Sequence, residues 1–343
     1  MASEDRTGSY LIALSQALKA EPYRFDFFQA LRRLECLNRH KPRIGQSQRP
    51  QEDPIRLSQE PSLIFAPSTL ASFEPAQDGK PSRLAVHFLG LLGPNGPLPI
   101  HLTEYARDRW RNHNDPTFAR FLDIFHHRLL SLFYRAWAAA QPTVNFDRPG
   151  SDRFATYVGS LFGIGMPLLH DRDTVPDLAK LHYAGHLVCQ SRHAEGLRAI
   201  LSDFFKLPVA IKEYMGHWLL LPEEGRCQLG TSPETGTLGM TVVIGARVWD
   251  GQHKFRIVIG PVGFADYLRL LPGGESLKRL VAWVRNYVGD ALIWDVNLIL
   301  KREEVPRFEL GKLGQLGWTT WLTSRPLEED ADDLLLDPRL TAN

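Results

Sequence analysis

The sequence predicts an α+β fold, with a helix-rich N-terminal half that has short strands and a C-terminal half of antiparallel strands and a helix. Apolar residues recur at helical spacing from Phe118 to Phe133, whereas Phe255, Ile257 and Ile259 alternate with the period of a strand. The 343 residues include 24 prolines and 27 glycines, so we expect many irregular loops.

The N-terminal half begins with signals for helices and short strands. Asp26 is a suitable N-cap for a helix whose apolar residues extend over Phe27–Leu37, and a shorter helix is expected over Tyr10–Leu18. The apolar segments Ile55–Leu57 and Leu63–Ala66 are predicted as short strands.

A long central helix is predicted from Asp115 to Ala140. Asp115 can cap it, Pro116 suits its first turn, and Pro142 stops it. The apolar stripe of this helix is wide, which indicates packing on more than one side.

The C-terminal half changes from helices to strands. Phe154–Leu169 is expected to be an irregular, glycine-rich stretch, and two helices are expected after it near Leu178–Cys189 and Ala194–Phe205. Asp250-Gly251 is a tight-turn signal, which predicts a hairpin between Thr241–Trp249 and the alternating segment that follows. Further strands are expected at Val209–Ile211, His217–Leu221 and Ile293–Leu300, with a helix after Ser276.

These patterns divide the chain into three parts. Residues 1–145 form an N-terminal α/β part with the long helix, and residues 146–325 form a C-terminal α+β part. Five of the six residues in Glu328–Asp333 are acidic, so residues 326–343 are predicted to be an acidic, disordered tail.

Bulk composition excludes several classes of protein. The net charge of +1 gives no electrostatic basis for binding nucleic acid or an anionic membrane. The acidic start at Ser3 argues against a signal peptide, and the least polar run, Val158–Leu169, is too short and glycine-rich for direct membrane insertion. Three distant cysteines form neither a disulfide framework nor a zinc motif, which fits the cytoplasm.

One segment, Arg83–Arg111, combines a strand pattern, a rigid turn and a helix pattern. The turn, here called the Gly/Pro loop, contains Gly90, Gly93, Pro94, Asn95, Gly96 and Pro97. A phosphate-binding loop needs a lysine and a hydroxyl residue after its last glycine, whereas Pro97 and Leu98 stand there. We therefore interpret the Gly/Pro loop as structural and expect no cofactor.

The same segment resembles the TssG family of type VI secretion baseplate subunits, also called ImpH or VasB. The resemblance rests on the run Gly90–Glu104 and on the segments Phe121–Trp137 and Leu238–Arg256. Weaker matches occur in the family's order at Phe27–Glu35, Phe65–Ser68, Leu271–Gly274 and Leu316–Leu322.

The resemblance implies a structural wedge subunit of a contractile injection machine, not an enzyme. It implies that the chain joins TssF, in two copies per subunit, and holds TssK trimers through extended loops, with TssE as a further candidate partner. The protein is then expected in the cytoplasm, in a baseplate docked at the inner-membrane complex.

Candidate partner contacts lie in segments that combine proline or glycine with large apolar residues. The candidates are Phe65, Leu70 and Phe73 in Ser62–Phe73, Phe162, Ile164 and Met166 in Phe154–Leu169, and Trp318 and Trp321 near the C-terminus. Packing of each segment on its own domain is the alternative.

The histidines supply the only enzyme hypothesis. His182 and His186 are four residues apart on a predicted helix, which is metal-ligand spacing, so a metal-dependent hydrolase is an alternative function. The pair lacks the adjacent glutamate of a metalloprotease helix, and we expect no metal. His127 is expected to form a hydrogen bond in the core. A free cytoplasmic adaptor is a third possibility.

Overall fold

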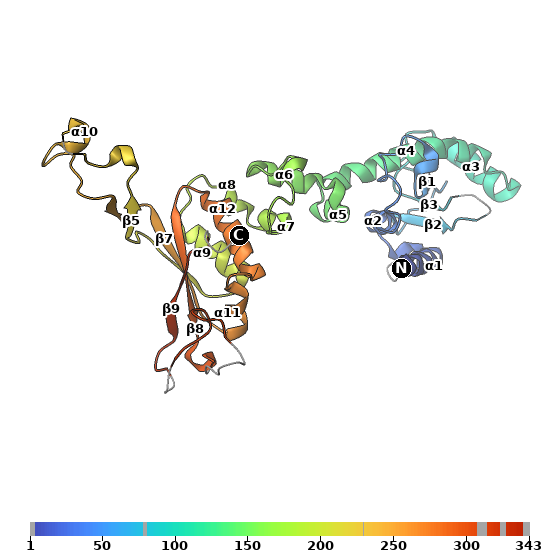
Figure 1. Cartoon of the computed structure of the whole chain (residues 1–343). Helices are drawn as coiled ribbons and strands as arrows, with labels where there is room; N and C mark the ends of the chain where they lie inside the picture. Colours follow the sequence, from blue (N-terminus) through green and yellow to red (C-terminus); the bar gives the residue numbers. More distant parts are fainter. Residues whose placement is uncertain (1–3, 78–80, 229, 307–313, 323–326, 339–343) are drawn as a thin grey trace. The chain divides into compact units, whose positions relative to one another are not determined.

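The computed structural model describes residues 4–77, 81–228, 230–306, 314–322 and 327–338. The chain folds as two compact units, Met1–Tyr157 and Val158–Asn343, each of which is described here by itself (Figure 1). The division falls twelve residues after the predicted boundary at 145, because the segment after residue 145 is fastened to α2: Arg32 pairs with Asp147 at 2.6 Å, and Arg148 donates to the Glu35 carbonyl oxygen at 2.8 Å.

The first unit packs its helices around a small sheet. Its elements are α1 (Glu4–Ala20), α2 (Phe27–Leu37), β1 (Arg56–Gln59), β2 (Leu70–Glu74), β3 (Arg83–Val86), α3 (Ile100–His113), α4 (Thr117–Ala140) and α5 (Pro142–Phe146), while α6 (Arg153–Leu161) crosses the division. The sheet has the order β1-β3-β2, in which β3 pairs parallel with β1 and antiparallel with β2.

Local capping signals confirm the two clearest helix predictions. The Asp26 carboxylate accepts from the backbone N–H of Phe28 at 2.9 Å, so α2 starts where expected. The Asp115 carboxylate accepts from the Thr117 hydroxyl and backbone N–H and from Arg109. The hydrogen bond from the Thr117 hydroxyl, followed by that from Arg109, lowers the pKa of Asp115 to about 2, so this cap is ionised at neutral pH.

The strand predicted at Leu63–Ala66 is wrong. Pro61 and Pro67 flank the segment, and prolines cannot donate to a sheet ladder. The strand lies instead at Leu70–Glu74, inside a segment that we expected to be irregular. Leu70 and Phe73 of this strand are buried in the core with Phe27, Leu84 and Tyr134.

The second unit places helices on one face of a four-stranded sheet of order β4-β7-β8-β9 (Figure 1). Its elements are α7 (Asp177–His182), α8 (Ala184–Val188), α9 (Ala194–Phe205), β4 (Val209–Lys212), β5 (His217–Leu220), α10 (Pro233–Gly236), β6 (Arg247–Asp250), β7 (Lys254–Val262), α11 (Phe264–Leu270), α12 (Glu275–Val288), β8 (Ile293–Leu300) and β9 (Ala331–Leu336). β7 and β8 are parallel, so α11 and α12 form the crossover that this pairing requires. Trp283 of α12 is fully buried against this sheet.

The predicted hairpin at Asp250-Gly251 has the wrong partners. β6 pairs with β5, and β7 pairs with β4, both antiparallel. β4 and β5 therefore run one after the other against β7 and β6. The two-stranded sheet of β5 and β6, here called the arm, continues from the β4-β7 pair of the four-stranded sheet, and Asp250-Gly251 lies at the irregularity between the two pairs. The register can be followed from the pair Lys212↔Arg256 to the pair His217↔Asp250. Between them lie four residues on one side, 213–216, and five on the other, 251–255. Such an extra residue is a bulge, which takes a turn-like sequence without reversing the chain.

Two further predictions from local patterns need correction. Phe154–Leu169 was expected to be irregular, but its first half belongs to α6, which ends before Gly163. The tail predicted from residue 326 contains β9, whose Leu334 pairs with Leu298 of β8. Asp332 and Asp333 occupy exposed positions of this edge strand, and Ala331, Leu334 and Leu336 are buried, so the charge run concealed a strand whose alternation is interrupted at the two adjacent acids. Residues 326 and 339–343 of the predicted tail lie outside the described residues.

We expect Leu334→Ala to lower the free energy of unfolding by about 2–3 kcal/mol, because it empties a buried position between β9 and the helices. The neighbouring Leu335 is 51% exposed and provides a matched control, for which Leu335→Ala should cost less than about 1 kcal/mol. Denaturant melts of the two variants make the comparison. Equal stabilities would mean that β9 does not close this core.

Candidate functional site

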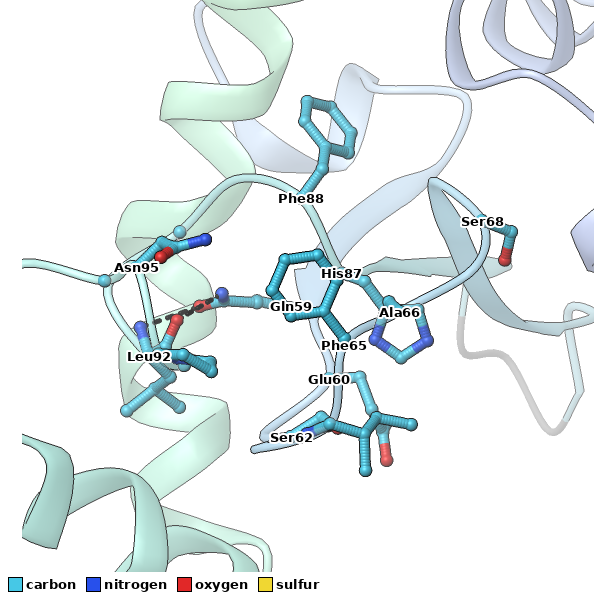
Figure 2. Close-up of a pocket in the computed structure, with 15 residues that line it drawn as sticks. Gln59, Glu60, Ser62, Phe65, Ala66, Ser68, His87, Phe88, Leu92 and Asn95 are labelled. Atoms are coloured by element: carbon cyan, nitrogen blue, oxygen red, sulfur yellow. Dashed lines mark hydrogen bonds between the residues drawn. The ribbon is translucent and has the colours of Figure 1, made fainter.

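Gln59, the last residue of β1, holds the Gly/Pro loop through its side chain (Figure 2). Its Nε2 donates to the Leu92 carbonyl oxygen at 2.7 Å, and its Oε1 accepts from the Leu92 N–H at 2.9 Å. Two paired strands exchange the same kinds of hydrogen bond, one N–H donated in each direction. The Gln59 amide therefore bonds both the N–H and the carbonyl oxygen of Leu92, which is buried and has no strand partner. A Cβ on Gly90 would lie 2.1 Å from Gln59 Oε1, so a larger residue there would displace the Gln59 side chain from its bonds to Leu92.

Two other glycines set the shape of the Gly/Pro loop. Gly93 has φ +100°, a conformation that favours glycine, and its N–H donates to Thr103 Oγ1 in α3 at 3.0 Å. A Cβ on Gly96 would lie 2.6 Å from the carbonyl oxygen of Leu91 and 2.7 Å from that of Leu92. Pro94, Asn95 and Pro97, the remaining members, are exposed. The Gly/Pro loop is therefore a turn closed by its own backbone.

Two histidines of α4 anchor the segments that flank this loop. His126 is fully buried; its Nε2 accepts from the Leu91 N–H at 3.0 Å, and its Nδ1 lies 3.2 Å from Asp123 Oδ1. Since Nε2 is the acceptor, Nδ1 carries the proton and donates it to Asp123. Asp123 also accepts from the Gln59 N–H at 3.2 Å and from Arg83 Nη1 at 2.8 Å.

His127 repeats this arrangement on β1. Its Nδ1 accepts from the Leu57 N–H at 3.1 Å, and its Nε2 lies 2.8 Å from Asp53 Oδ2. The core hydrogen bond expected for His127 is thus confirmed. Aspartate–histidine pairs also occur in active sites, but here the second nitrogen of each ring accepts a backbone N–H. In both His126 and His127, each ring nitrogen already has a hydrogen-bond partner, so neither ring has a nitrogen free to act on a substrate. Both histidines act as structural anchors.

A hollow of about 250 Å³ lies between the Gly/Pro loop and the segment after β1 (Figure 2). Glu60, Phe65, His87, Phe88 and Asn95 are among its lining residues. Burial lowers the pKa of His87 and, as the largest effect, raises the pKa of Glu60, so both changes favour the neutral forms.

The predicted partner contacts in Ser62–Phe73 separate into two groups. Phe65 is 95% exposed, as a contact residue should be. Leu70 and Phe73 of β2 lie in the core of the first unit and are 1% and 5% exposed. Because they are buried, they do not present a surface to a partner, and we no longer propose them as partner contacts. Sequence periodicity could not separate the groups, because Pro67 and the start of β2 fall within the same apolar run.

The other predicted contacts are also divided. Met166 is exposed, whereas Ile164 is half-buried and Phe162 packs against the core of the second unit. Trp318 and Trp321 are partly buried against the same core. The Trp318 carbonyl oxygen accepts from the Tyr267 hydroxyl at 2.9 Å, and Trp321 Nε1 donates to Asp333 at 3.1 Å. Core packing, the alternative interpretation, describes the two tryptophans better.

His182 and His186 do not share a helix. α7 ends at His182, Tyr183 follows, and His186 belongs to α8, so the four-residue spacing does not place the rings on one helical face. His182 lies 3.8 Å from Asp203 on the surface. Within the described residues, no group of three or more His, Cys, Asp or Glu side chains could hold a metal ion, and no helix is long and apolar enough to cross a membrane.

Sequence patterns missed one strongly exposed apolar segment, which is the outer part of the arm. Trp218 of β5 and Trp249 of β6 pair across the arm with ring centroids 5.3 Å apart, and both are exposed. Residues 221–246 connect these strands and include α10 (Figure 1). In this connection, here called the arm tip, Leu238, Met240 and Ile244 are 85–91% exposed. Their spacing of two and four residues would also suit a strand, so the sequence pattern does not show that they are exposed.

We expect Gly96→Ala to destabilise the first unit by about 1–3 kcal/mol, because the added Cβ meets two backbone carbonyls that cannot move without opening the turn. Gly150→Ala is a matched control in the same unit, since a Cβ there meets nothing within 4 Å. Thermal melts should show a loss of several degrees for Gly96→Ala alone. A melting temperature equal to that of the control would contradict the assigned close approach.

The sequence profile of the family described as "Type VI secretion, TssG" matches residues 21–323. Comparison with curated proteins finds no match. Among solved structures, a chain of "The baseplate complex from the type VI secretion system" is similar with a TM-score of 0.63 and 22% identity, over 92% of this chain and 90% of that one. A chain of the "TssK-TssF-TssG baseplate subcomplex" is similar with a TM-score of 0.50 and 22% identity, over 61% of this chain and 89% of that one. Because the family profile spans most of the sequence, the chain belongs to the TssG family of type VI secretion.

Proposed function

We propose that this protein is a structural subunit of a type VI secretion baseplate and that it binds TssF and TssK. The match to the TssG family over residues 21–323 carries the proposal. The similar solved structures support it, since one is a TssK-TssF-TssG subcomplex. The two aspartate–histidine pairs, which could have suggested catalysis, are engaged in holding the backbone. No observation favours the metal-dependent hydrolase or the free adaptor.

The arm is our candidate for holding TssK. A subunit that grips a second partner through loops needs apolar anchors that stand clear of its own core. Leu238, Met240 and Ile244 in the arm tip meet this requirement, as Phe65 and Leu168 do in the predicted segments. Trp218 and Trp249 extend the apolar surface down the arm. Phe65 and Met166 remain secondary candidates for the same role.

The finer features of assembly belong to the same proposal. The protein joins two copies of TssF in each wedge, and TssE is a further candidate neighbour. TssK connects the wedge to the inner-membrane complex, which places the protein at the cytoplasmic side of that membrane. The function is then mechanical, since permanent interfaces of roughly 2,000 Å² or more hold such assemblies together.

The first test is co-expression with TssF and TssK from the same organism. We expect one complex on size exclusion that contains all three proteins, with more TssF than TssG by quantitative staining. Separate elution at micromolar concentration would contradict the proposed function.

The second test removes the arm tip. The Leu221 N–H donates to the Ala246 carbonyl oxygen at 2.9 Å, so these residues face each other and a two-residue Asn-Gly turn can replace residues 222–245. We expect this variant to lose TssK and to retain TssF, with an unchanged melting temperature. The point variant Ile244→Asp should weaken TssK binding at least tenfold, as loss of an interface anchor does.

Phe65→Asp provides the comparison, because Phe65 is equally exposed but lies in the first unit. TssK binding that survives tip removal but fails in Phe65→Asp would transfer the TssK contact to the segment after β1.

A further inference from the structure

α4 has a second apolar face that the described residues of its own unit leave exposed. Phe121, Phe125, Leu129 and Leu132 follow one another at spacings of four, four and three residues, which places them along one side of the helix. They are 43–55% exposed, whereas Leu130 and Tyr134 on the other side are buried. Packing on more than one side was predicted from the width of the stripe, and within its unit only one side is packed.

The second face continues into an aromatic cluster. Phe133 is 43% exposed and lies 5.9 Å from Phe88 and 5.6 Å from Phe28, measured between ring centroids. Phe28 in turn stacks on Trp137 at 4.5 Å. The four residues of the face, with Phe133 and Phe88, expose on the order of 500 Å² of apolar side chain. This approaches the roughly 800 Å² that each partner contributes to a standard interface, and it reaches the size at which patches on single chains are commonly functional.

The charges of α4 restrict what can cover this face. Arg128 is exposed and stands three residues after Phe125 and four before Leu132, within the face. It makes no ion pair with the residues that the structure describes. The single acid of α4, Asp123, is buried and bonded to Arg83. A second copy of the chain, paired about a twofold axis on this face, would bring Arg128 near its own counterpart, so self-pairing is disfavoured.

We propose that this second face of α4 is the docking surface for TssF, and that TssF covers it with an amphipathic helix that has apolar residues along one side and an acid opposite Arg128. The spacing of the face over three turns fits a helix, because ridges of one helix pack between those of another. This inference rests on the proposed function, which assigns TssK to the arm of the second unit. The two partners then occupy surfaces on different units of the chain.

The test compares substitutions that keep the helix and its core side unchanged. Phe125→Asp and Leu132→Asp place a charge in the centre of the face, and Arg128→Glu reverses its one charge. Ile124→Asp is the matched control, because Ile124 is 66% exposed on α4 but lies to one side of the face. Each variant is co-expressed with TssF and TssK, and the isolated protein is examined by circular dichroism and thermal melting.

We expect Phe125→Asp and Leu132→Asp to weaken TssF binding at least tenfold, Arg128→Glu to weaken it severalfold, and Ile124→Asp to leave it unchanged. TssK should still bind all four variants, and their melting temperatures should equal that of the parent. TssF binding at the parent level in the two aspartate variants would overturn the proposal. So would loss of TssK with TssF retained, or loss of both partners by folded protein.

A third result would point to a second copy of the chain: dimers of the isolated parent that dissociate in Phe125→Asp would overturn the assignment to TssF. Binding of TssF and TssK by the unsubstituted protein distinguishes failure of this inference from failure of the proposed function. If the parent itself binds neither TssF nor TssK, the proposed function fails. If the parent binds both and the variants also do, only the assignment of α4 fails.

Discussion

Asp123 is a buried carboxylate on which the first unit depends. Its two oxygens accept from the Gln59 N–H, His126 Nδ1 and Arg83 Nη1, which come from β1, α4 and β3. Removing one member of a buried charge pair typically costs about 3–5 kcal/mol, a large part of the 5–15 kcal/mol that stabilises an ordinary domain. These bonds also fix Gln59, whose side chain then positions Leu92 and the Gly/Pro loop. One charge therefore connects the sheet, the long helix and the loop.

The sequence predicted the elements whose signals are local. Asp26 and Asp115 mark the starts of α2 and α4, because a cap acts on N–H groups only two or three residues away. The Gly/Pro loop was also predicted to be a structural turn, since its prolines fix their own φ and its glycines allow backbone conformations that other residues avoid. The reason for that shape was not, because Gln59 lies 33 residues before Leu92, and nothing near either residue indicates the contact.

Strand pairing was the main failure, because it too depends on contacts between residues that are far apart in the sequence. Asp250-Gly251 has the composition of a hairpin turn, and a bulge can use the same residues without reversing the chain. β9 was concealed because its two acids, Asp332 and Asp333, occupy exposed positions of an edge strand, where charge is favoured. The partner contacts at Leu70 and Phe73 failed similarly, since burial depends on which elements meet and not on the apolar character of a segment.

The division into two units has a consequence for how the protein acts on its partners. The helix α6, about 14 Å long, crosses the division, so a short stretch of chain joins the two units. Once one unit is bound, a short linker that spans the two binding sites holds the other near the assembly at an effective concentration on the order of millimolar. A contact with micromolar intrinsic affinity would then be almost fully occupied. The tether thus allows individually weak and correctable contacts to add up to a durable joint.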